Sequence, residues 1–184
     1  MSTDIQEPLQ KTDSPRGKSL AFVDHIIRRC QADNGLRAAL KRADNPTTEY
    51  QSWEVLAGFH INLEYENQRL PHAAIAAAIA RAKVEKNGTA KIGQAIARCY
   101  EDGNASDQAK ARLRRLLACD SVPEACRILR PLFSLIEAKG NIVPDYAGLL
   151  NDLLWFGHDD SRTRIKARWA QDFYGKLADG GKDE

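Results

Sequence analysis

Apolar side chains recur with the period of an α-helix along most of this chain. Between residues 22 and 30 they occupy positions i, i+1, i+4, i+5 and i+8, and Ile165, Trp169 and Phe173 are spaced four apart. Each set lies on one face of a helix, as expected for helices that cover a hydrophobic core. Strong helix formers fill the long stretches, whereas β-branched runs and apolar–polar alternation are scarce. The sequence therefore predicts an all-α fold.

The length and the breaks in this pattern predict how the helices are divided. A chain of 184 residues can form one domain or two small ones with a real core. Residues 1–18 are polar and without periodicity, and we expect them to form a disordered tail. The segment Asp-Gly-Asn-Ala-Ser at 102–106 is the best candidate boundary. We therefore expect two small helical bundles in tandem, at residues 19–104 and 105–184.

Three single residues carry structural predictions of their own. Pro71 is expected to open a helix, because a missing N–H does no harm in the first turn. Pro131 should kink or split a helix over residues 123–139. Gly93 lies inside an amphipathic segment, which indicates close contact between helices rather than good helix propensity.

The three tryptophans have two possible uses. Trp53, Trp155 and Trp169 could stack on bases, as aromatic side chains do in proteins that bind single strands. Each lies in an apolar helical context, however, and this context favours a position in the hydrophobic core.

Charge is segregated into blocks, although the formal net charge is only +2. Residues 16–42 hold seven basic side chains and two acidic ones. Residues 44–66 hold five acidic side chains and no basic one, and residues 69–98 hold six basic side chains and one acidic side chain, Glu85. Such blocks can build surfaces of opposite sign on one nearly neutral molecule. Ordinary solvated helix faces give a similar distribution, so charge alone identifies no partner.

The sequence lacks the motifs of an enzyme, a metal site or a membrane anchor. It has no phosphate-binding glycine loop or nucleophile elbow, and its four cysteines form no zinc spacing with its four histidines. His158-Asp159-Asp160 matches part of a metal phosphohydrolase site, but further ligands are missing and either aspartate is better explained as a helix N-cap. No signal peptide or membrane-length apolar run is found. We expect a cytoplasmic, non-enzymatic protein without cofactor, metal or membrane contact.

Arginine is the strongest functional signal. A guanidinium group matches phosphate oxygens and is weakly hydrated, so clustered arginines suit a nucleic-acid backbone. Because no helix rich in base-reading side chains accompanies them, we expect electrostatic binding that is independent of sequence. The clustered residues are Arg112, Arg114, Arg115, Arg127 and Arg130, followed by Arg162, Arg164, Lys166 and Arg168.

Six stretches carry a resemblance to a known family. They are residues 34–43, 92–97, 112–117, 128–132, 143–155 and 168–174, and the last contains Trp-Ala-Gln-Asp-Phe-Tyr, the most telling piece. In this order and spacing they resemble the CasB family, the small subunit of the type I-E CRISPR surveillance complex called Cascade. Two positions depart from the family's pattern, because Lys41 stands where arginine is commoner and Gln94 loses a charge.

The resemblance implies a two-domain helical subunit of a ribonucleoprotein, without enzymatic activity. Its expected partners are the guide RNA, the target and displaced DNA strands, the large subunit and the backbone subunits, and a second copy of itself. Family members bind RNA and DNA without sequence preference and help to hold the R-loop open. Any one carried-over residue could instead form a surface ion pair. The nucleic-acid-binding residues implied by position are Arg37, Lys41, Arg42, Arg112, Arg115, Arg127, Arg130, Arg162, Arg164 and Arg168.

Two other classes of function stay open from the sequence. Residues 27–42 read as two short helices joined by a glycine-containing turn, which is the outline of a helix-turn-helix transcription regulator. The second of these helices is short and alanine-rich, with few side chains that read bases. A protein-only adaptor is the other class, with the acidic block at 44–66 docking a basic partner.

Overall fold

The computed structural model describes residues 14–175, and the helices in this range confirm the all-α prediction. Within the same range the β-structure amounts to an isolated bridge between Ala90 and Pro144. The α-helices are α1 (Pro15–Ala32), α2 (Asn34–Leu40), α3 (Trp53–Gly58), α4 (Glu66–Ala82), α5 (Ile92–Arg98), α6 (Asp107–Leu117), α7 (Val122–Lys139), α8 (Tyr146–Trp155) and α9 (Asp159–Tyr174), with 3-10 helices η1 (Glu49–Ser52) and η2 (Gly103–Ala105).

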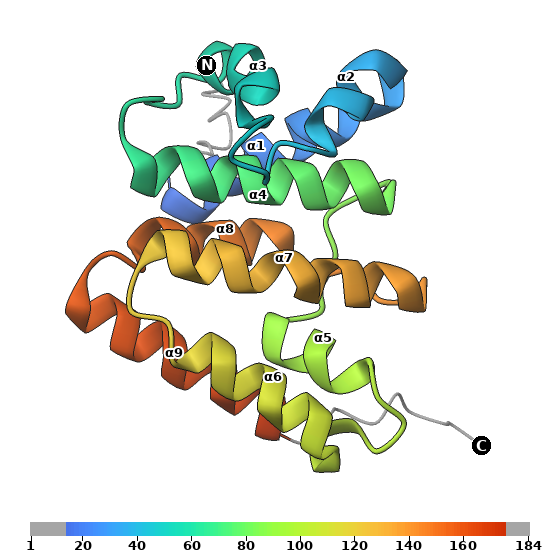
Figure 1. Ribbon diagram of the computed structural model, residues 1–184, viewed down its shortest axis with the longest axis vertical. Coiled ribbons are helices and arrows are strands. Elements are labelled where there is room, and N and C mark those ends of the chain that lie inside the picture. Colours follow the sequence, from blue (N-terminus) through green and yellow to red (C-terminus); the bar gives the residue numbers. More distant parts are fainter. Residues whose placement is uncertain (1–13, 176–184) are drawn as a thin grey trace, which may run out of the picture.

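The helices are stacked along the long axis of the molecule (Figure 1). In this view α1 to α4 lie in the upper half, α7 and α8 cross the middle, and α5, α6 and α9 lie below. Helices far apart in the sequence pack together, since α1 contacts α8 and α5 contacts α9. The predicted division at residues 104 and 105 stays a prediction, and helices from its two sides share one hydrophobic cluster.

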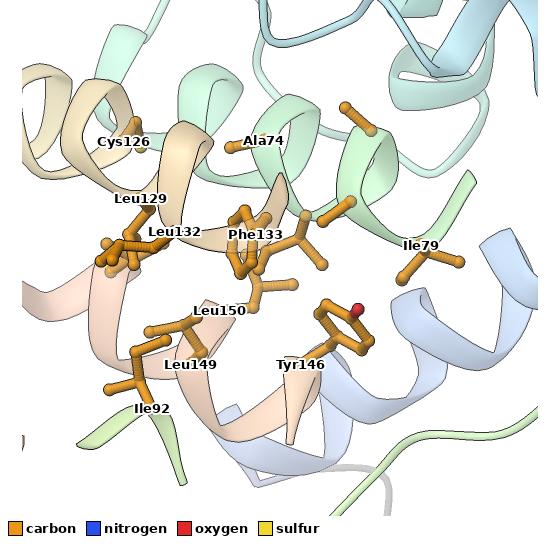
Figure 2. Packing of buried hydrophobic residues seen from close by; sticks show 14 of the residues in the cluster. Ala74, Ile79, Ile92, Cys126, Leu129, Leu132, Phe133, Tyr146, Leu149 and Leu150 are labelled. Carbon is orange, nitrogen blue, oxygen red and sulfur yellow. The ribbon is translucent and has the colours of Figure 1, made fainter. Parts of the chain in front are cut away.

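Helix α4 is the centre of the upper half. Every residue from Pro71 to Ala80 is buried, because α1, α2, α7 and α8 all pack against it. Its many alanines have short side chains, which lets these neighbours approach closely. Below it, Leu132 and Phe133 of α7 point toward Leu149 and Leu150 of α8 (Figure 2).

Side-chain caps explain where several helices begin. Ser14, Asp33, Ser106, Ser121 and Asp145 each accept a backbone N–H from the first turn of the following helix. Such residues satisfy amides that have no partner within the helix.

The expected disordered tail at 1–18 is wrong for its last part. Ser14 caps α1 and Pro15 occupies its first turn, so residues 15–18 are helical. Residues 1–13 of the expected tail lie outside the described residues.

Two prolines lie inside helices. Pro71 does not open α4 as predicted, because the helix begins at Glu66. Arg69 fixes the first turns through hydrogen bonds to Glu49 and to the Leu63 carbonyl, so tertiary contacts offset the missing N–H.

Pro131 does not split α7, which runs unbroken from Val122 to Lys139. Pro131 is exposed, so water can reach the carbonyl group that its ring leaves unpaired.

The tryptophan prediction is confirmed for one residue and wrong for two. Trp169 is buried and stacks on Phe156, with 5.4 Å between ring centroids. Trp53 and Trp155 are 41% and 45% exposed. The apolar stripe of α8 continues through Leu153 to Phe156, which takes the core position and leaves Trp155 toward solvent.

Gly93 lies where α5 and α9 approach most closely, as the sequence indicated. A Cβ atom at this position would overlap the carbonyl oxygen of Trp169 and lie 2.6 Å from the backbone nitrogen of Phe173. Real Cβ atoms essentially never come this close to backbone, so only glycine fits without moving one of the helices.

Asp145 joins three segments of the fold. It caps α8, and its carboxylate lies 2.6 Å from Lys91 Nζ and 3.0 Å from an Arg16 guanidinium nitrogen. Asn87 also donates to it. Although burial alone would raise the pKa of Asp145, hydrogen bonds from Lys91, Asn87 and the Gly148 amide hold it below its usual value.

Candidate nucleic-acid interface

The first group of implied binding residues lies at one end of the molecule, on α2 and the turn after it. Arg42 is exposed, and Arg37 and Lys41 are half-buried. Arg28 and Arg29, exposed near the end of α1, extend this group. Burial raises the pKa of the Cys30 thiol, and the nearby Arg37 and Arg29 charges oppose that rise, which places both cations around the end of α1. We call Arg28, Arg29, Arg37, Lys41 and Arg42 the α2 cluster.

Arg28 and Arg29 were missing from the implied binding residues. The signal that would have found them is the charge block at 16–42, which contains both. They precede the aligned stretch at 34–43, so the resemblance could not supply them.

The second group lies on α6 and α9, which run side by side in opposite directions. Lys166 Nζ of α9 lies 3.0 Å from Asp120 Oδ1, just beyond the end of α6. At the other end, Asn104 Nδ2 donates to the carbonyl of Tyr174 over 3.5 Å. The antiparallel packing brings the last turn of α6 beside the first turns of α9.

Three arginines lie at this end of the two helices, in the last turn of α6 and the first turns of α9, and we call them the α6–α9 cluster: Arg115, Arg162 and Arg164. Arg115 and Arg164 are exposed. The Lys166 hydrogen bond and charge hold the pKa of Asp120 below its usual value, and Arg162 adds to this effect, so Arg162 also lies near Asp120. Arg162 forms a pair with Asp159 over 2.7 Å, which is a surface pair of small energetic value because Asp159 is fully solvated.

Two predicted binding residues form hydrogen bonds to neighbouring segments of the chain. Arg168 Nη2 donates to Asp152 Oδ1 over 2.6 Å, and the other oxygen of this carboxylate accepts from Trp169 Nε1 over 2.9 Å. Arg112 Nε donates to the Tyr100 hydroxyl over 2.6 Å. The guanidinium group of Arg168 thus turns toward α8, and phosphate would have to displace Asp152 from it; the predicted role of Arg168 in binding stays a prediction.

Arg127 and Arg130 lie on α7, and Arg130 reaches the turn that follows α2. Arg130 Nε lies 3.6 Å from Asp44 Oδ1, and Arg81 Nη2 lies 2.8 Å from Asp44 Oδ2. Arg127 is exposed, with Glu124 3.9 Å away. Both arginines line a groove that also contains acidic side chains. Their surroundings are less favourable for phosphate than those of the other two groups.

Six of the ten implied binding residues thus lie in two separate groups, the α2 cluster and the α6–α9 cluster. In Figure 1 the helix α2 lies near the top of the molecule, and α6 and α9 lie at the bottom. Among residues 14–175, the implied binding residues without an ion pair are Arg37, Lys41, Arg42, Arg112, Arg115 and Arg164.

The described residues are predicted from the sequence to hold neither a metal site nor a membrane span. Within 14–175, no group of three or more His, Cys, Asp or Glu side chains is arranged to hold a metal ion. Burial raises the pKa of Cys126 to about 12, so its thiol stays protonated. The backbone of His158 forms the N-cap of α9, which corrects the prediction that Asp159 or Asp160 is the cap. Across the same residues, no helix combines the length and apolar character of a membrane span.

The chain is similar to known proteins in both sequence and fold. Residues 36–174 match the family described as CRISPR-associated protein Cse2. A chain of a solved "CRISPR RNA-guided surveillance complex" is 21% identical with a TM-score of 0.66, over 86% of this chain and 91% of that one. CasB from Thermobifida fusca is 17% identical with a TM-score of 0.59, over 85% and 97% of the two chains. No curated protein matches the sequence.

Proposed function

Because this chain belongs to the CRISPR-associated protein Cse2 family, we propose that it is a non-catalytic small subunit of a CRISPR RNA-guided surveillance complex. It binds guide RNA together with the target and displaced DNA strands of the R-loop, through the phosphate backbone and without sequence preference. It acts in the cytoplasm beside the large subunit, the backbone subunits and a second copy of itself.

The observation that carries the proposal is the pair of separate basic surfaces on one subunit. Exposed arginines that lack an ion pair among residues 14–175 remain available to phosphate, whereas paired ones would first have to leave a carboxylate. Two such surfaces allow one subunit to contact two stretches of nucleic acid at once. Base reading is not expected, since α2 is seven residues long and offers Asn34 as its one amide side chain.

The test is a salt titration with random-sequence RNA and DNA. The logarithm of the affinity should fall linearly with the logarithm of the salt concentration, with a slope set by the number of phosphates neutralised. Replacing Arg115 and Arg164 together by alanine should make the slope shallower by up to about two contacts. Replacing Arg98 and Lys139, exposed basic residues outside both clusters, is the matched control and should change the slope less.

Three outcomes would count against the proposal. A preference of about tenfold or more for one duplex sequence over scrambled duplexes would favour a transcription regulator. Equal slopes for the Arg115/Arg164 variant and the wild type would remove the α6–α9 cluster from the binding surface. Nuclease turnover that survives rigorous purification and disappears on Asp159→Ala substitution would contradict the non-catalytic role.

A further inference from the structure

A groove separate from the α6–α9 cluster lies between the N-terminal half of α4 and the start of α7. Its volume is about 810 Å³, and its apolar wall is formed by Leu70, Ala73, Ala74, Pro123 and Cys126. Ala74 and Cys126 lie on the neighbouring faces of α4 and α7 (Figure 2). Because these side chains are short, the groove has room for several apolar side chains of a ligand.

The basic side chains of the groove are already paired. Each arginine that lines it has a carboxylate within ion-pair distance, and these carboxylates line it too. Glu66 also lines the groove, is exposed and has no ion pair among residues 14–175, so the unpaired charge is negative. The pairs are Arg69 with Glu49 at 2.6 Å, Arg130 with Asp44 at 3.6 Å and Arg127 with Glu124 at 3.9 Å.

Two exposed aromatic residues are next to groove-lining residues in the sequence. Tyr50 follows Glu49 and Tyr65 precedes Glu66, and both of these glutamates line the groove. Tyr50 is 60% and Tyr65 50% exposed, although rings of this size are usually buried at least in part. Exposed aromatic rings are typical of surfaces that bind another protein.

We propose that this groove binds a basic segment of a protein partner, which inserts large apolar side chains between α4 and α7. The apolar wall supplies the burial, the tyrosines supply contact area, and Glu66 attracts the basic residues of the partner. A nucleic-acid strand is the poorer occupant, because four carboxylates line the groove and would face its phosphates. The proposal stands apart from nucleic-acid binding and is tested separately.

The first experiment selects partners without assuming a sequence. A library of random dodecapeptides is displayed and selected on the immobilised full-length protein. We expect enrichment of peptides that combine Lys or Arg with Leu, Phe or Trp. Enrichment of acidic peptides, or no enrichment above the support alone, would overturn the proposal.

Variants then locate the binding site of a selected peptide. The double substitution Tyr65→Ala with Glu66→Lys should weaken peptide binding by at least about tenfold in calorimetry. The control is Tyr174→Ala with Glu101→Lys, which makes the same changes at exposed positions outside the groove and should leave the affinity unchanged. Melting curves and circular dichroism confirm that both variants stay folded.

RNA binding by the same two variants separates this proposal from the proposed function. We expect the Tyr65/Glu66 variant to bind random RNA with the wild-type salt slope. If it loses peptide affinity no more than the control, or changes RNA binding instead, the groove is not a site for a basic protein segment.

Discussion

The close approach of α5 to α9 predicts that one substitution has opposite effects at two glycines. Gly93→Ala and Gly58→Ala both add a methyl group within a helix, and neither glycine has a positive φ angle. Alanine gains up to about 1 kcal/mol over glycine from helix propensity. At Gly58 nothing lies within 4 Å of the added atom, so this gain should be kept.

At Gly93 the added methyl group meets backbone atoms that cannot rotate away. Its Cβ would overlap the Trp169 carbonyl oxygen and lie 2.6 Å from the Phe173 nitrogen and 3.1 Å from the Asp172 carbonyl carbon. The helices must separate by about 1 Å, and a gap of this size loses about a quarter to a half of the van der Waals attraction between each pair of atoms that it moves apart. Overpacking typically costs about 1–3 kcal/mol and here should reach the upper end. After the propensity gain, we expect a net loss of about 2 kcal/mol.

Thermal and urea unfolding, followed by circular dichroism, measure both variants. A loss of about 2 kcal/mol lowers the melting temperature by about 4–8 °C in a chain of this size, whereas Gly58→Ala should raise it by up to about 4 °C. A Gly93→Ala protein that melts at or above the wild-type temperature would refute the close packing of α5 on α9.

Three further predictions concern stability. Burial lowers the pKa of His72 to about 4. In the unfolded chain His72 binds its proton near pH 6.5, so the free energy of unfolding should fall by up to about 3 kcal/mol as the pH drops from 6.5 to 4. The His72→Gln variant should lose most of this pH dependence, as measured by urea titrations at each pH. Trp169→Ala should lower the free energy of unfolding by about 3–5 kcal/mol because it removes a buried, stacked ring, whereas Trp155→Ala should lower it by less than about 1 kcal/mol. Similar urea midpoints for the two variants would contradict the difference in burial. Arg168→Ala should lower the free energy of unfolding by about 1 kcal/mol because Asp152 loses a partner, and Arg164→Ala should leave the melting temperature nearly unchanged. Equal melting temperatures for these two variants would show that the ion pair of Arg168 with Asp152 contributes nothing to stability.

Much of the fold could be predicted from local patterns. The stripe at 22–30 and the spacing of Ile165, Trp169 and Phe173 identify helix faces that are buried in the structure. Gly93 could be identified because an amphipathic helix tolerates glycine mainly where a neighbour comes close. The errors at Pro71 and Trp155 have a different origin, because contacts with distant residues decide these positions: Arg69 near Pro71 binds Glu49, and Phe156 rather than Trp155 stacks on Trp169.

The candidate interface was predictable only as a set of residue types. The sequence identifies arginines that suit phosphate, but not which of them face a carboxylate from another helix. Arg130 forms an ion pair with Asp44, and Arg16 forms one with Asp145, which is 129 residues away in the sequence. No local sequence pattern contains such pairs. Arg28 and Arg29 illustrate the converse, because their membership of the α2 cluster depends on how α2 folds back beside α1.

The packing of α5 on α9 and of α1 on α8 has a consequence for the growing chain. Ribosomes add about 5–20 residues per second, so α9 follows α5 by several seconds, and α8 follows α1 by longer still. Until then α1 and α5 have only their earlier partners, such as α4 for α1 and α6 for α5. The packing of the first half is therefore completed only when the last helices emerge, and a chain that is released early exposes surfaces on which chaperones and proteases act.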